Sequence, residues 1–92
     1  MYKEIRMELP LYQMHLIDAM RLGCKIWMDD LGKTTYHIKI KNSVKEISEQ
    51  TIATLVWRGL IKMSGGEYIL TDLGMNSKIF SSDKDKKTLY SV

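Results

Sequence analysis

The chain of 92 residues has only one cysteine, one proline and one phenylalanine, and it has no long apolar run. Because Cys24 is the single cysteine, no internal disulfide can form, and a reducing compartment fits. No apolar stretch approaches the roughly 20 residues that a membrane-spanning helix needs. The first residues lack the basic-then-apolar order of a secretion signal. We therefore expect a cytoplasmic protein without membrane contact.

The usual signals of catalysis and metal binding are missing too. His15, Cys24 and His37 do not show the C-x-x-C or H-x-x-x-H spacing of metal sites. Cys24 opens an apolar alternating segment, where packing explains it better than nucleophilic chemistry does. The glycines of segment 64–66 lack the helix and lysine that follow a phosphate-binding loop. We predict no enzyme activity, no catalytic or metal-binding residue and no cofactor.

The charges that are present have a small positive excess. Hydrophobic residues make up 45% and charged residues 27%, which is ordinary for a globular protein. We expect one domain over residues 1–80, followed by a flexible charged tail over residues 81–92. The net charge of +3 is a weak hint of a nucleic-acid partner. The whole excess lies in residues 24–42 and in the tail, and the other segments are balanced.

Residues 9–22 have the apolar spacing of a helix that starts near Pro10 and stops at Gly23. Its main apolar face groups Leu9, Tyr12, Leu16, Ala19 and Met20. A second, narrower strip of Leu11, His15 and Leu22 can be covered either by residues 2–7 or by another subunit. A homodimer is therefore one of two readings of this strip.

Residues 24–41 change to a period of two around a turn at 29–33, which predicts a β-hairpin. One face of this hairpin is apolar, and the other shows lysines, His37 and Trp27. A main helix follows and ends near Arg58. It starts either at Ser43, which opens a capping box, or at Ser48. Residues 61–70 predict a second, tight hairpin, and residues 72–80 a short helix. We expect the two hairpins to join in one sheet.

The stretch from the main helix through the second hairpin resembles the recognition helix and wing of a winged helix-turn-helix. Gly59, Leu60 and Ile61 are followed by a glycine-containing hairpin and then by Tyr68, Leu70, Thr71 and Gly74. MarR-type and related small bacterial or phage regulators share this pattern. The resemblance implies an α+β winged helix-turn-helix with an additional N-terminal β-hairpin, in the order helix, hairpin, helix, hairpin, short helix. It also implies a DNA-binding transcription regulator.

If the main helix enters a major groove, its outward residues would meet base edges. Phosphate contacts would then come mainly from lysines outside this helix, which has a single cation in Arg58. The candidates for contact with double-stranded DNA are Lys39, Lys41, Lys45, Gln50, Thr51, Thr54, Arg58 and Lys62.

Trp57 points to the same side of the main helix as the groove-facing residues. Three interpretations are open: the tail or the first hairpin covers it, it anchors a protein partner, or it touches nucleic acid. Trp27 admits the same choices. Since tryptophan is enriched at interface hot spots, the alternative function is a protein-interaction module, such as a phage or mobile-element inhibitor that contacts a host protein.

Overall fold

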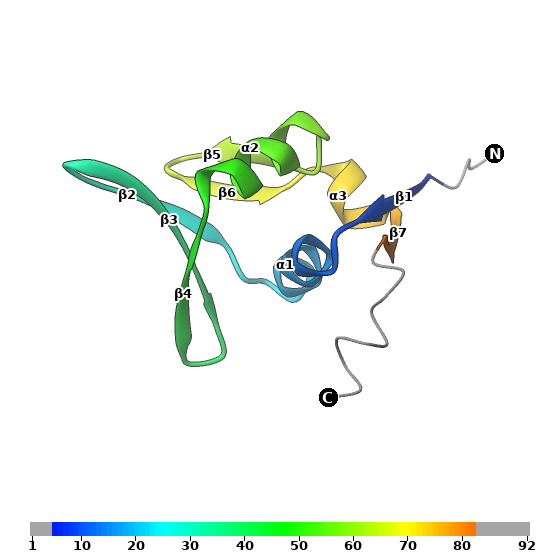
Figure 1. Cartoon of the computed structure of the whole chain (residues 1–92), viewed down its shortest axis with the longest axis horizontal. Helices are drawn as coiled ribbons and strands as arrows, with labels where there is room; N and C mark the ends of the chain where they lie inside the picture. Colours follow the sequence, from blue (N-terminus) through cyan, green and yellow to red (C-terminus); the bar gives the residue numbers. More distant parts are fainter. Residues whose placement is uncertain (1–4, 83–92) are drawn as a thin grey trace.

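The computed structural model describes residues 5–82, which form seven strands and three helices. The expected tail therefore lies outside the described residues from residue 83 onward, while Ser81 ends the last strand. The elements in chain order are β1 (Arg6–Leu9), α1 (Leu11–Arg21), β2 (Ile26–Leu31), β3 (Lys33–Ile40), β4 (Ser43–Ile47), α2 (Glu49–Trp57), β5 (Ile61–Ser64), β6 (Glu67–Leu70), α3 (Asp72–Asn76) and β7 (Lys78–Ser81) (Figure 1).

Five of the strands form one antiparallel sheet in the order β4-β3-β2-β6-β5. The meander β2–β3–β4 joins the hairpin β5–β6 through only two residue pairs, Ile26 with Tyr68 and Trp27 with Glu67. This confirms that the two predicted hairpins share a sheet. The ends of the β2–β3 and β3–β4 hairpins reach beyond the helices, as Figure 1 shows. Separately, β1 and β7 form a parallel pair.

The chain is α+β, but the predicted winged helix-turn-helix is wrong. A strand precedes the first helix, and three antiparallel strands fill the whole interval between α1 and α2. The predicted order of helix, hairpin, helix, hairpin and short helix therefore lacks β1, β4 and β7. Because β4 pairs with β3, the first hairpin is part of a five-stranded sheet and is not an addition to a helical domain.

The structure decides between the two predicted starts of the main helix and shortens the last helix. Ser43 starts β4, and the N-cap of α2 is Ser48, whose Oγ accepts the Thr51 N–H at 3.2 Å. The last helix, predicted over residues 72–80, ends at Asn76, and β7 follows it. Tyr12, on the predicted apolar face of α1, is 51% exposed. Leu22, which follows α1, is 87% exposed, so residues 5–7 do not cover it, and cover by another subunit stays a prediction.

One face of the five-stranded sheet packs in the core, and we call it the covered face. The buried residues that the structure describes in this sheet all lie there: Ile26, Ile38, Ile47 and Ile61. Buried side chains of α1 and α2, with Leu9 and Leu60, complete the same cluster. Tyr36 and Tyr68 pack edge to face beside it, and burial, followed by the neighbouring Tyr36 hydroxyl, raises the pKa of Tyr68.

The residues that carry the family resemblance hold α2, β5 and α3 together. Gly59 turns the chain out of α2 with a φ of 78°, and Leu60 and Ile61 then enter the core. Thr71 donates its hydroxyl to the Gly59 carbonyl and its N–H to the Leu60 carbonyl, and its Oγ1 also accepts the Gly74 N–H as the N-cap of α3. These contacts are structural, so they explain the sequence pattern without any ligand.

Candidate nucleic-acid interface

The other face of the five-stranded sheet, which we call the open face, has no buried residue among those described. Side chains alternate between the two faces along each strand, so the open-face side chains of paired residues line up in rows that cross the strands. Trp27 on β2 pairs with His37 on β3 and with Glu67 on β6. His37 in turn pairs with Glu46 on β4. The centre of the open face is therefore an aromatic pair with one carboxylate on each side.

The two aromatic rings of this row lie against each other. The centroids of Trp27 and His37 are 5.7 Å apart, and their planes differ by 28°, which is a stacked arrangement. Both side chains are partly exposed. The Nδ1 atom of His37 has no hydrogen-bond partner within residues 5–82. The open face thus carries an aromatic pair on two neighbouring strands, and the unpaired Nδ1 atom of His37 is buried beneath its surface.

Lysines occupy the next row of the open face. Lys39 lies two residues after His37, and Lys62 on β5 pairs with Ile69, two residues after Glu67. Lys25 comes just before β2, and its Nζ atom lies 3.6 Å from the Glu67 carboxylate, which places it on this face. Both side chains of this ion pair are about half exposed, so it stabilises the fold by less than about 1 kcal/mol. Lys25 can therefore exchange Glu67 for another anion.

The β3–β4 turn adds a cation two residues beyond Lys39. Lys41 and Asn42 form the two-residue connection, and Lys41 has a φ of 57°. This left-handed conformation costs a residue with a Cβ atom roughly 1 kcal/mol. Glycine or asparagine would suit the position better, so the lysine at the tip is not explained by turn geometry alone.

The structure separates the predicted DNA-contact residues into groups. Lys39 and Lys62 share the open face, and Lys41 adjoins it, whereas Lys45 lies on the opposite side of β4. The remaining four, Gln50, Thr51, Thr54 and Arg58, belong to the α2 region. Lys25, which alternation in the first hairpin puts on the same face as Trp27, was not among the predicted contacts, and the structure adds its ion pair with Glu67.

On α2, several of the predicted base-reading groups have local partners. The Thr54 hydroxyl donates to the Gln50 carbonyl at 2.9 Å, and Thr51 Oγ1 accepts the Ser48 hydroxyl at 2.9 Å. Arg58 reaches back to the Glu8 carbonyl over 3.4 Å. Glu49 occupies the first turn of the helix, where it would repel a phosphate. Three of the four predicted contact residues near α2 therefore already have hydrogen-bond partners within the protein.

Trp57 is 86% exposed at the end of α2 and is not covered by the first hairpin. Val56, the preceding residue, is 42% exposed. Trp57 is therefore not part of the core, and its role as a protein contact remains a prediction.

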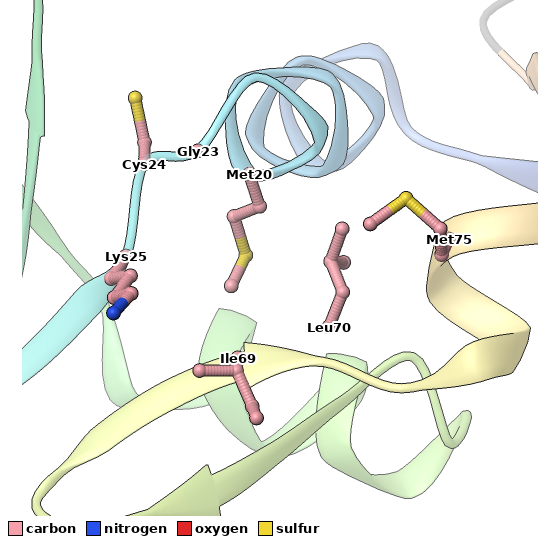
Figure 2. A pocket seen from close by; sticks show the side chains of 7 residues that line it. All are labelled: Met20, Gly23, Cys24, Lys25, Ile69, Leu70 and Met75. Carbon is pink, nitrogen blue, oxygen red and sulfur yellow. The ribbon is translucent and has the colours of Figure 1, made fainter.

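A small pocket lies between the end of α1, β6 and α3, and it has a volume of about 200 Å³. Figure 2 shows Met20, Leu70 and Met75 around it, while the Cys24 sulfur points away from these side chains. Pockets that hold drug-sized ligands begin near roughly 300 Å³ and have converging polar groups. Within the described residues, no group of His, Cys, Asp or Glu side chains could hold a metal ion. We therefore place no small-molecule site here.

Comparisons with protein-family models, curated proteins and solved structures give no match to this chain. The likeness to MarR-type regulators accordingly rests on the residue pattern alone. None of the helices within residues 5–82 has the length and apolar character needed to cross a membrane.

Proposed function

We propose that the protein binds nucleic acid through the open face of the five-stranded sheet and the adjoining β3–β4 turn. The observation that carries the proposal is the row of Lys25, Lys39 and Lys62 beside the stacked Trp27–His37 pair. Lysines supply the phosphate contacts that dominate affinity, and aromatic rings supply the stacking contacts. Transcription regulation and capture of a host protein through Trp57 remain predictions.

The charge on this surface fixes the kind of binding to expect. Lys25, Lys39 and Lys62, with Lys41 at the turn, can meet about four phosphates. Four contacts give a log–log salt slope of about −3.6 on a duplex and about −2.8 on a single strand. Between about 50 and 200 mM salt, affinity for a single strand should then fall about 50-fold. Because Glu46 and Glu67 lie on the same face, the complex should be weak at physiological salt.

Lys39→Ala should weaken binding several-fold at low salt and reduce the salt slope by roughly 0.7 to 0.9, the share of one phosphate contact. Lys45→Ala is the matched control, since it removes the same charge from the same hairpin but from its other side. The measurement is fluorescence anisotropy of labelled random-sequence DNA of about 20 nucleotides, single-stranded and duplex, over a range of salt. The proposal fails if the protein binds neither form at low salt, or if Lys45→Ala has the larger effect.

Glu67→Gln should strengthen binding about two- to fivefold at low salt. The change removes a carboxylate beside Trp27 and releases Lys25 from its ion pair. Glu49→Gln in α2 makes the same chemical change away from the sheet and should have a smaller effect. Anisotropy titrations of the two variants compare the surfaces directly. A gain with Glu49→Gln alone would move the contact surface to α2.

A further inference from the structure

We infer that the open face selects single-stranded nucleic acid, with a base stacked on the Trp27–His37 pair; this inference rests on the proposed function. Base faces are hidden inside a duplex, so aromatic rings on a sheet can reach them only when the strand is unpaired. Trp27 and His37 are already stacked on neighbouring strands near the middle of the sheet. A duplex would use the lysines and leave these rings unused.

The spacing of the two rows fits one nucleotide. Residues two apart on a strand lie on the same face, about 7 Å from each other. His37 and Lys39 have this relation on β3, as do Trp27 and Lys25 on the β2 side. A nucleotide can therefore place its base on the rings while its phosphate lies beside the lysines.

Two carboxylates lie at the ends of the row that contains Trp27 and His37, and they restrict where the phosphates of a bound strand can lie. Glu46 is next to His37, and Glu67 is next to Trp27. Phosphates are repelled from both ends of this row and attracted to the lysine row next to it. The backbone of the strand should therefore follow Lys39, Lys25 and Lys62 across the sheet, with its bases turned toward the rings.

Tryptophan fluorescence can report the base contact directly. The chain has two tryptophans, so the Trp57→Phe variant keeps Trp27 as the only one. Trp57 is 86% exposed, and its replacement should leave the fold intact. Titration of this variant with oligo(dT) and oligo(rU) of about 15 nucleotides should quench Trp27 fluorescence strongly, and affinity for these strands should exceed that for a duplex about tenfold. Comparison of the affinities for oligo(dT) and oligo(rU) shows whether the sugar contributes to binding.

The Trp27→Phe variant is the matched control, because it keeps Trp57 as the only tryptophan and retains a ring for stacking. Its fluorescence should not change on binding, although anisotropy still reports the complex. Trp27→Ala should weaken single-strand binding about tenfold without changing the salt slope, because the lysines remain. Circular dichroism checks the fold of each variant. If Trp27→Ala does not fold, the Trp27 fluorescence of the Trp57→Phe variant still tests the inference.

The outcomes separate this inference from the proposed function. Salt-dependent binding with equal affinity for duplex and single strand, and with unchanged Trp27 fluorescence, would overturn the inference and leave nucleic-acid binding in place. Quenching of Trp57 in the Trp27→Phe variant would overturn it in favour of α2. Absence of binding to every strand at low salt would overturn the proposed function itself.

Discussion

Gly74→Ala is expected to lower the free energy of unfolding by about 3 kcal/mol or more. Gly74 is buried in α3, and a Cβ atom there would overlap the Leu60 carbonyl oxygen and lie 2.9 Å from Leu70 Cδ2. The carbonyl cannot move away cheaply, because it accepts the Thr71 N–H at 3.0 Å. A methyl group at this point therefore has to separate α3 from the end of α2.

Thermal or urea unfolding followed by circular dichroism measures this effect. For a domain of this size, 3 kcal/mol corresponds to a fall in Tm of about 15 °C. Gly65→Ala is the control, because nothing lies within 4 Å of its added Cβ and only its φ of 60° opposes the change. That cost should be about 1 kcal/mol. Equal losses in the two variants would show that the close approach at Gly74 is not important for stability.

Arg21→Met should cost about 2 kcal/mol of stability, the second largest effect that we expect. The partly buried guanidinium of Arg21 donates to the Gly74 carbonyl from Nε at 3.1 Å and from Nη2 at 2.9 Å, and to the Ser77 carbonyl at 2.7 Å. It thereby fixes the end of α1 to the carbonyls at the end of α3. Methionine keeps most of the side-chain volume but leaves these acceptors without their donor.

Arg58→Met tests whether the loss is specific to these contacts. Arg58 is exposed and makes one long bond of 3.4 Å to the Glu8 carbonyl, so its replacement should change stability by less than about 0.5 kcal/mol. Arg21→Lys should recover only part of the loss, since an ammonium group cannot reproduce the planar set of donors. Equal unfolding midpoints for Arg21→Met and Arg58→Met would contradict the proposed connection between α1 and α3.

The part of the fold that could be predicted is the part with strong local signals. Gly59, the glycine turn of the second hairpin and the Thr71 cap each mark a chain reversal, and each reversal is present. β4 was missed because only Ile47 is buried in it, so no apolar alternation marks Ser43–Ile47 as a strand. Serine followed by glutamate three residues later then resembled a capping box.

The candidate interface could be predicted in part for the same reason. Alternation in the first hairpin correctly placed Trp27 and His37 on the face that carries Lys39. It also placed Lys25, two residues before Trp27, on that face, but it could not place Lys62 beside them, because that depends on how β2 and β6 pair, and these strands are about 40 residues apart in the chain. Register between distant strands is set by packing of their buried faces rather than by local sequence.

The parallel pair β1–β7 has a consequence for the order of folding. Arg6 pairs with Lys78, so the intervening chain of roughly 70 residues must close a loop, at an entropic cost of about 4 kcal/mol. Contacts so distant form slowly unless earlier structure brings the two segments together. During synthesis, Arg6–Leu9 cannot pair before Lys78–Ser81 has been made. The strand made first is thus among the last to find its partner, and until then its backbone groups remain available to other chains.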